Sequence, residues 1–287
     1  MRLPLKPNRA GWPAGLANLL RASADPRVLL DPAASREQFA RAVSVLKFGT
    51  TFKQTEADRF PQTIACLASL RFETPPVVLD VGASDGTTSL DVMRALDFGR
   101  YYSTDLNNEC RVQQRGEWTC FYSSDAVPIL AVSPRWVVYP DTDGALPPLG
   151  FLARRILAGV PPMAADAQRL ALVTPELRAA RDPRIELRRY DITQPWSGSP
   201  VDILLAANIL NRFYFSDQQL GAIIRNLGRA LRTGRPAWLA IVDNREDERA
   251  SIFEVSNGAA RLHRRVGAGT DVEALALQAL GPAGQAA

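Results

Sequence analysis

The sequence predicts an α/β fold built on a seven-stranded, mostly parallel, doubly wound sheet with an antiparallel hairpin at its C-terminal end. Three observations predict it. Short apolar segments alternate with segments of helical periodicity, which is typical of parallel strands joined by helices. An apolar strand at 77–81 runs directly into a glycine turn at 82–86. Two strand-like segments, 252–255 and 259–263, are separated by Ser256-Asn257-Gly258, a hairpin signal.

The composition is that of a globular protein with a large core, because 46% of the 287 residues are hydrophobic and 22% are charged. The net charge is +4, but the arginines are scattered, so we expect no nucleic-acid partner. No apolar run is long enough for a membrane span, and no apolar core follows the basic N-terminal residues, so we expect neither a membrane partner nor a secretory signal.

The residue types that build disulfides and metal sites are scarce. Three cysteines at unhelpful spacing indicate neither a disulfide framework nor a zinc site, and a reducing cytoplasm is the expected compartment. The single histidine, His263, disfavours a Ser-His-Asp triad or a multi-histidine metal centre. It falls in the predicted hairpin and is interpreted as structural, and no metal is expected.

Residues 1–75 are predicted to form an irregular arm followed by a helical cap. Prolines are frequent up to residue 34, with a short apolar patch at 16–20. Ser35 is predicted to cap a helix with Gln38 three residues later. A second helix is expected over 54–70, interrupted or started at Pro61, and Pro75-Pro76 ends this region.

The first strand of the main domain, expected to extend over 76–280, leads into Gly82-Ala83-Ser84-Asp85-Gly86 and then a helix from Thr87. This strand–turn–helix order leaves backbone N–H groups open to a ligand. The next strand, 101–105, ends at Asp105, 19 positions beyond Gly86. An acidic residue at that distance, at the end of the next strand, can bind ribose hydroxyls.

Residues 106–184 interrupt the alternating pattern and are predicted to be an insertion. Strands are expected at 118–122, 127–132 and 136–139, and helices at 151–157 and around 164–180, where Pro175 must start a new helix or kink the old one. The insertion is too long for an ordinary loop, so we expect an active-site lid or an oligomer contact such as a homodimer interface.

The alternating pattern then resumes. Strands at 185–190, 201–207 and 238–242 end at Asp191, Asn208 and Asp243, and Ser216 with Gln219 caps a long helix. A disordered tail is expected over 281–287. In a doubly wound sheet ligands bind at the carboxyl ends of strands, which here carry polar residues suited to a nucleoside.

These motifs resemble those of class I S-adenosylmethionine-dependent methyltransferases over about 76–265, less the insertion. The resemblance implies S-adenosylmethionine as cofactor, a ribose contact at Asp105 and an adenine contact at Asp191-Ile192. It implies that the segment after strand 201–207 lines the methyl-transfer site. The cofactor-binding residues expected on this basis are Asp80, Gly82, Ala83, Ser84, Asp85, Gly86, Asp105, Leu106, Asp191, Ile192 and Asn208. The catalytic candidates are Asn208, Asn211 and Tyr214, and Thr51, Lys53, Glu56 and Arg59 are candidates for closing over the cofactor.

The chain departs from the family pattern in three places. Ser84 replaces the middle glycine of the turn, no Asn-Pro-Pro-Tyr motif is present, and no histidine follows the fourth strand. The segment Asn208 to Asn211 followed by Tyr214 is similar to that of chemotaxis-type protein-glutamate methyltransferases, but their helical recognition domain is not recognisable.

The leading hypothesis is a methyltransferase for a small-molecule acceptor, a secondary or specialised metabolite, with the N-terminal helices and the insertion as a substrate cap. One alternative is a cyclase or lyase that consumes S-adenosylmethionine on the same fold. Others are a chemotaxis-type protein-carboxylate methyltransferase and a non-enzymatic cofactor-binding scaffold.

Overall fold

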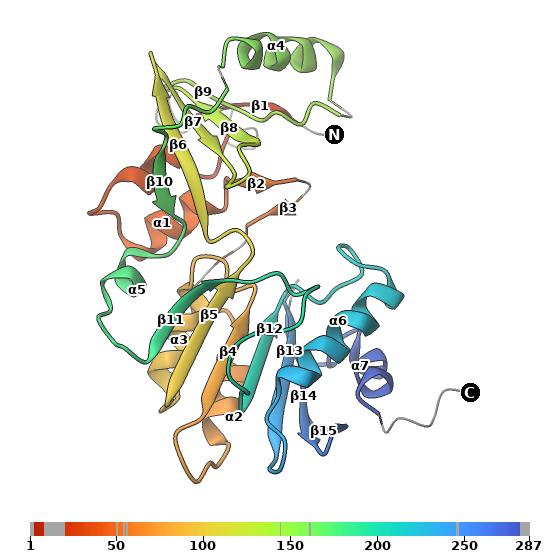
Figure 1. The fold of residues 1–287 in the computed structure, drawn as a ribbon. Coiled ribbons are helices and arrows are strands. Elements are labelled where there is room, and N and C mark those ends of the chain that lie inside the picture. Colours follow the sequence, from red (N-terminus) through yellow and green to blue (C-terminus); the bar gives the residue numbers. More distant parts are fainter. Residues whose placement is uncertain are drawn as a thin grey trace. The chain divides into compact units, whose positions relative to one another are not determined.

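The chain forms two compact units in a computed structural model that describes residues 3–8, 21–49, 51–53, 55, 57–143, 145–160, 162–244 and 247–281, without the side chains of 51 and 52. The antiparallel unit combines Met1–Glu56 with Asn107–Ala180 (Figure 1). The parallel unit combines Ala57–Leu106 with Arg181–Ala287. This division differs from the expected one, since residues before 57 share a unit with the predicted insertion.

The parallel unit contains the predicted seven-stranded sheet, in the order β11-β5-β4-β12-β13-β14-β15. The first five strands run parallel to one another, and β14 and β15 are antiparallel to their neighbours. The strands are β11 (Ile185–Arg189), β5 (Arg100–Asp105), β4 (Val77–Val81), β12 (Ile203–Ala207), β13 (Ala237–Asn244), β14 (Glu248–Ser256) and β15 (Ala259–Val266). Chain order reverses at β4, so the crevice between β4 and β12 is the topological switch point of the sheet.

Helices cover both faces of this sheet because alternate residues of each central strand point to opposite sides. Val78 packs in one cluster with residues of α2 (Pro61–Ser69) and α3 (Thr87–Ala95). Leu79 and Val81 pack in another cluster with α6 (Asp217–Ala230) and α7 (Glu273–Ala279). The predicted Ser216–Gln219 capping box is present at the start of α6.

The antiparallel unit has its own six-stranded sheet, in the order β1-β9-β8-β7-β6-β10. The strands are β1 (Leu5–Pro7), β6 (Glu109–Arg115), β7 (Trp118–Tyr122), β8 (Pro128–Val132), β9 (Trp136–Val138) and β10 (Gln168–Ala171). A large apolar cluster joins this sheet to α1 (Arg36–Val43) and to the 3-10 helix η2 (Pro26–Leu30). Smaller clusters join other residues of the sheet to α4 (Pro147–Ala158). Two short strands, β2 (Lys47–Phe48) and β3 (Thr51–Phe52), and the helix α5 (Pro175–Ala179) complete the unit.

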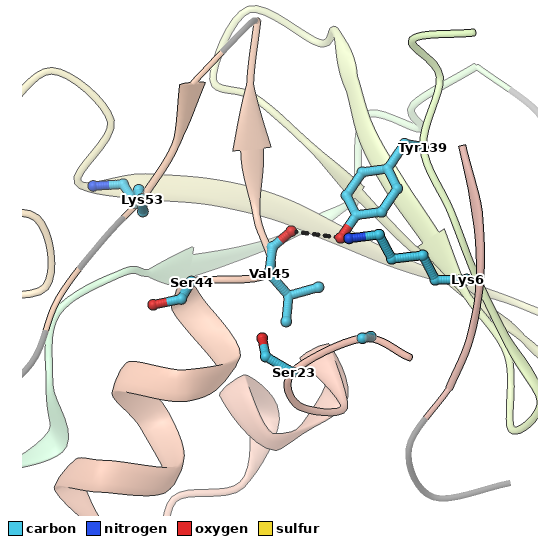
Figure 2. Close-up of a pocket in the computed structure, with 7 residues that line it drawn as sticks. Lys6, Ser23, Ser44, Val45, Lys53 and Tyr139 are labelled. Carbon is cyan, nitrogen blue, oxygen red and sulfur yellow. Dashed lines mark hydrogen bonds between the residues drawn. The ribbon is translucent and has the colours of Figure 1, made fainter. Parts of the chain in front are cut away.

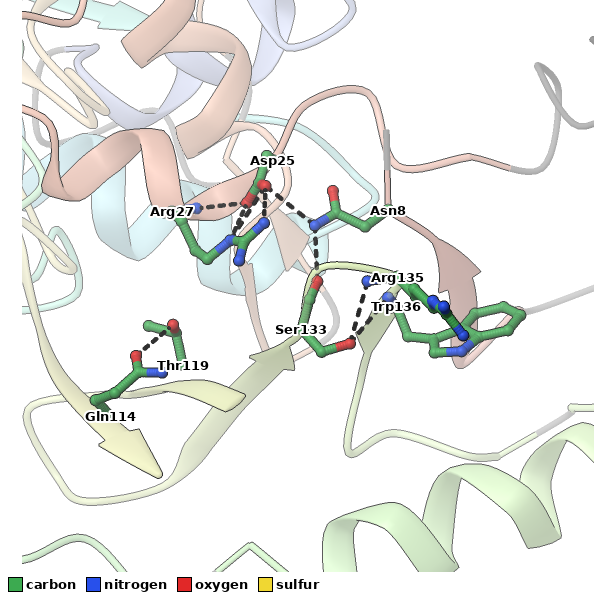
Figure 3. A network of polar contacts seen from close by, with 8 residues as sticks. All are labelled: Asn8, Asp25, Arg27, Gln114, Thr119, Ser133, Arg135 and Trp136. Carbon is green, nitrogen blue, oxygen red and sulfur yellow. Dashed lines mark hydrogen bonds and ion pairs between the residues drawn. The ribbon is translucent and has the colours of Figure 1, made fainter. Parts of the chain in front are cut away.

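A buried polar network holds the N-terminal segment on this sheet (Figure 3). Asn8 is fully buried, and its amide donates to the Asp25 carboxylate at 3.1 Å and to the Ser133 carbonyl at 2.9 Å. Burial raises the pKa of Asp25, but the hydrogen bonds and the charge of Arg27 outweigh it and hold the pKa below its ordinary value. The network therefore fixes the segments that carry Asn8 and Asp25 against the sheet.

The sequence predictions for this unit are partly correct. The strands at 118–122, 127–132 and 136–139 and the Ser35 helix are confirmed, and the helix at 151–157 is longer than predicted. The helix expected over 164–180 is wrong, because 168–171 pairs with β6 as a strand and Pro175 starts a separate short helix. The predicted patch at 16–20 and the start of the helix at 54 lie outside the described residues.

The cysteines and the candidate metal ligands of the chain form neither a disulfide nor a metal cluster among the described residues. Cys66, Cys110 and Cys120 are all buried thiols. Within the described residues, no cluster of three or more His, Cys, Asp or Glu side chains could hold a metal ion. In the same residues, none of the helices combines the length and the apolar character needed to span a membrane.

Candidate nucleoside site

The glycine turn after β4 has an alternating backbone in which three residues are left-handed. Gly82, Ser84 and Gly86 have φ angles of +70°, +58° and +79°. A non-glycine residue in this region costs about 1 kcal/mol or more. The Ser84 N–H donates to the Asp105 carboxylate at 2.9 Å, which compensates for that conformation. The serine that replaces the middle glycine of the motif therefore keeps a glycine-like backbone.

The N–H groups of the turn are largely satisfied within the protein. Ala83 donates to the Thr104 carbonyl, Gly86 donates to the Ala83 carbonyl, and Thr87 donates to the Asp85 carboxylate, each at 2.9 Å. The prediction that the turn leaves its N–H groups open to a ligand is thus wrong for these residues and for Ser84. The reason is that the turn folds back on itself and on the end of β5.

Asp85 occupies the start of α3, where a dinucleotide enzyme would place a phosphate. Its side chain is fully buried, and it accepts hydrogen bonds from both the backbone and the hydroxyl of Thr87. A carboxylate at a helix N-terminus is stabilised by the helix dipole and repels a second anion. This end of the sheet is therefore suited to a ligand that carries no phosphate.

Asp80 lies beneath the turn, enclosed by protein. Its carboxylate accepts hydrogen bonds from the Ser89 hydroxyl at 2.6 Å and from the Tyr101 hydroxyl at 3.0 Å. Burial raises the pKa of Asp80 to about 6, although these two hydrogen bonds oppose the shift. Asp80 thus links β4 to α3 through Ser89 and to β5 through Tyr101, and it has a structural role beneath the turn.

Four predicted cofactor-binding residues lie at the ends of the neighbouring strands β5 and β11. Asp105 ends β5, and the following Leu106 is 44% exposed. The Tyr190 N–H donates to the Asp105 carbonyl, so Asp191 follows β11 just beyond the level of Asp105. Asp191 accepts from the backbone and hydroxyl of Thr193 in a tight turn, and Ile192 is buried in the core.

Of the catalytic candidates after β12, the two asparagines are hydrogen-bonded within the loop and the tyrosine is exposed. Asn208 is left-handed at φ +56°, and its side-chain oxygen accepts from the Asn244 N–H at 2.7 Å. Asn211 donates to the Asn208 carbonyl at 3.1 Å and accepts from the Phe213 N–H at 3.0 Å. Both side chains thus shape the loop, whereas Tyr214 is 44% exposed.

Two residues that bear on this edge of the sheet were not identified from the sequence. Ile209 packs on Gly82 so closely that a Cβ added at Gly82 would lie 2.6 Å from the Ile209 Cδ1. Asn244 at the end of β13 donates through its amide to the Arg59 carbonyl at 3.0 Å, and Arg59 donates back to the Asn244 carbonyl at 3.3 Å. The only sequence signal for Ile209 was its position directly after Asn208, in the segment that follows the strand.

The remaining candidates fall elsewhere. Arg59 precedes α2, which begins only at Pro61, so it is not on a helix. Lys53 belongs to the antiparallel unit, the side chain of Thr51 is not described, and Glu56 lies outside the described residues. His263 packs edge-on against Trp238 with ring centroids 4.8 Å apart.

Together these observations define a class of site: a doubly wound sheet with carboxylates in the turn after β4 and at the ends of β5 and β11. The glycine turn, Asp105 and Asp191 provide the positions at which such sheets bind a nucleoside.

The sequence matches no known protein family and no curated protein. It is similar to solved structures of methyltransferases. One is an O-methyltransferase family protein from Burkholderia thailandensis, with 13% identity over 75% of this chain and 42% of that chain and a TM-score of 0.34. Another is the mitomycin 7-O-methyltransferase MmcR, with 18% identity over 81% of this chain and 45% of that chain and a TM-score of 0.33.

A third similar structure is CalS10 from Micromonospora echinaspora, an amino pentose methyltransferase with S-adenosylmethionine bound. It shows 13% identity over 70% of this chain and 64% of that chain, with a TM-score of 0.31. The chain spans less than half the length of the first two proteins. TM-scores of this size establish no relationship, so function has to be inferred from the chain's own residues.

Proposed function

We propose that this protein is an S-adenosylmethionine-dependent methyltransferase acting on a small-molecule acceptor. The observation that carries the proposal is the buried Asp85 carboxylate at the start of α3, beside the Ser84–Asp105 contact. A dinucleotide would place its pyrophosphate against that carboxylate. S-adenosylmethionine carries a sulfonium and an ammonium and no phosphate, so its charge suits an acidic turn.

The residues at the strand ends fit the parts of this cofactor. Asp105 would accept the ribose hydroxyls, because a carboxylate oxygen can accept a ligand bond beside the one from Ser84. Asp191 would accept the adenine amino group. Leu106, exposed at the end of β5, would provide an apolar contact for the base, whereas Ile192 is buried in the core. The backbone of the turn from Gly82 to Gly86 would lie against the methionyl part.

Bound there, S-adenosylmethionine supplies a methyl group that the sulfonium charge has already activated. The chain's contribution is to hold the acceptor in line and to exclude water. Asn208 and Asn211 would do this indirectly, by holding the loop after β12 in its left-handed turn. Tyr214, with its exposed ring, is the candidate that would touch the acceptor. A general base is needed only where the nucleophile holds its proton tightly.

Calorimetry tests the cofactor. We expect S-adenosylmethionine and S-adenosylhomocysteine to bind and NAD to fail to bind, because the Asp85 carboxylate repels its pyrophosphate. Absence of binding by both adenosyl ligands would overturn the proposal.

Product analysis tests the reaction. The protein is incubated with methyl-labelled S-adenosylmethionine and a panel of small phenols, carboxylates and amines, and the products are separated by chromatography. Methyl transfer yields S-adenosylhomocysteine and labelled acceptor. Acceptor-independent formation of methylthioadenosine would instead show that the cofactor itself is cleaved.

A further inference from the structure

The excess positive charge of the chain is confined to the antiparallel unit. The ranges Met1–Glu56 and Asn107–Ala180 contain 16 Lys and Arg residues against 11 Asp and Glu residues, whereas the parallel unit contains 18 against 19. The chain has only three lysines, and all three belong to the antiparallel unit. Lys47 forms an ion pair with Asp141 at 2.5 Å. The other two, Lys6 and Lys53, line one cavity.

This cavity, with a volume of about 280 Å³, lies wholly within the antiparallel unit (Figure 2). Its polar lining comes from Lys6, Ser23, Ser44, Lys53 and Tyr139. Figure 2 shows Lys6 beside Tyr139, with Ser44 and Lys53 on the opposite side. No carboxylate is among the described residues that line it. The lysine side chains make the lining cationic, and ammonium groups bind oxyanions.

The cavity walls are held in place by the protein's own hydrogen bonds. The Tyr139 hydroxyl donates to the Val45 carbonyl at 3.0 Å, and the Ser44 hydroxyl donates to the Ala40 carbonyl at 2.9 Å. The Asn8–Asp25 hydrogen bond joins the segments that carry Lys6 and Ser23. Binding a ligand here would not first have to order these segments, which favours affinity.

The charges around the cavity also favour an anion. Lys6 lies in β1 with its ammonium 5.6 Å from the centroid of the Tyr139 ring, and burial lowers the pKa of this lysine. Burial raises the pKa of the Tyr139 hydroxyl, so it stays neutral and adds no negative charge. An anion that enters the cavity would meet the Lys6 ammonium and no carboxylate among the described residues that line it.

We propose that this cavity binds a small organic anion, with its carboxylate or phosphate group on Lys6 and its apolar body against Tyr139, Val45 and Ala22. The volume corresponds to roughly nine water molecules at liquid density, which is enough for a molecule the size of benzoate or phenyl phosphate. This site is distinct from the strand-end site of the parallel unit, and it does not depend on methyl transfer.

The test is a titration of the full chain, followed by ligand-observed NMR, with benzoate, phenyl phosphate and neutral benzyl alcohol. We expect at least one anion to bind at least about tenfold more tightly than the alcohol, the scale of a charge-assisted hydrogen bond. The tighter of the two anions identifies the group as carboxylate or phosphate. Failure of both anions to bind, or equal binding of the alcohol, would overturn the proposal.

Variants locate the site. Lys6→Met should weaken anion binding about tenfold, while Lys6→Arg, which keeps the charge, should weaken it less. Lys47→Met is the matched control, since it removes a lysine of the same unit that does not line the cavity. Ser23→Val fills the cavity without changing charge and should also weaken binding, which keeps the test available if Lys6→Met fails to fold. Equal losses for Lys47→Met and Lys6→Met, or full binding by Ser23→Val, would contradict the assignment.

Discussion

The Asp105 carboxylate accepts a hydrogen bond from the Ser84 N–H at 2.9 Å, which ties the end of β5 to the turn after β4. Through this contact the residue expected to hold the ribose also supports the left-handed conformation of Ser84. The conformation of the turn and the predicted recognition of the ribose therefore both depend on the Asp105 side chain.

Replacing Asp105 separates these two contributions. Asp105→Ala should weaken S-adenosylmethionine binding by more than about tenfold, because it removes hydrogen bonds to a charged group. Asp105→Asn retains an oxygen for the Ser84 N–H and should preserve the turn while still weakening binding. Calorimetry measures affinity and a thermal melt checks folding. Asp97→Ala, an exposed acid in the same unit, is the control. Undiminished affinity in folded Asp105→Ala would refute the ribose assignment.

The contact between Gly82 and Ile209 predicts that the glycine cannot be replaced cheaply. A Cβ at Gly82 would lie 2.6 Å from the Ile209 Cδ1, and the residue has a φ of +70°. We expect Gly82→Ala to reduce the free energy of unfolding by about 2–3 kcal/mol, from overpacking and backbone strain together. Urea denaturation measures this loss.

Two further variants divide the loss between its causes. Gly234 has a φ of +82° with nothing within 4 Å of an added Cβ, so Gly234→Ala reports backbone strain without a clash. Ile209→Ala in the Gly82→Ala background should recover the clash component in a double-mutant cycle. If Gly82→Ala costs no more than Gly234→Ala, the packing of Ile209 on the turn is not limiting.

The parallel unit was predictable because its strands are continuous apolar runs and its helices carry local start signals. The run 203–207 and the Ser216–Gln219 box determine a strand and a helix without help from distant residues. The antiparallel unit was predictable only in part, since the strands at 118–122, 127–132 and 136–139 and the Ser35 helix were predicted but β1 and β10 were not. β1 has three residues and pairs with β9, far along the chain, and β10 has only one buried residue. Periodicity carries no signal in segments this short.

The candidate site shows the same limit. The spacing between Gly86 and Asp105 predicted a ribose contact because strand and turn lengths are nearly constant in this topology. Sequence could not show that Asp85 folds back to satisfy Thr87, or that Ile209 covers Gly82, since both depend on loop conformation. Asn208 and Asn211 were polar residues in the expected place, but their hydrogen bonds to backbone were visible only in three dimensions.

The buried Asp80 predicts an unusual pH dependence of stability. Its pKa is raised to about 6, mainly by burial, whereas an unfolded aspartate titrates near 4. The folded protein therefore keeps a proton that the unfolded chain has lost, so this group stabilises the fold below about pH 4. That contribution is lost as the pH rises through about 6, and it amounts to on the order of 2–3 kcal/mol.

Asp80→Asn removes this titration while preserving an oxygen for Ser89 and Tyr101. The variant's stability relative to the parent should therefore increase by about 2–3 kcal/mol between pH 4 and pH 7. Urea denaturation at both values measures the change, and Asp97→Asn, at an exposed site, should show none of it. A difference between Asp80→Asn and the parent that stays constant with pH would show that Asp80 titrates normally.

The loop after β12 predicts different kinetic effects for its two kinds of residue. Asn208→Ala removes the acceptor of the Asn244 N–H, so we expect a shifted loop, a rise in KM for the acceptor and a loss of stability of about 1–2 kcal/mol. Tyr214→Phe removes only an exposed hydroxyl and should leave stability and cofactor affinity unchanged while lowering kcat.

Steady-state assays with the acceptor found by the product screen, together with urea denaturation, measure both effects. Asn226→Ala, a half-buried asparagine on α6 whose amide donates to the Thr193 carbonyl, is the control for Asn208→Ala. A Tyr214→Phe variant with full kcat would remove Tyr214 from contact with the reacting groups, and the loop would then act only by shape.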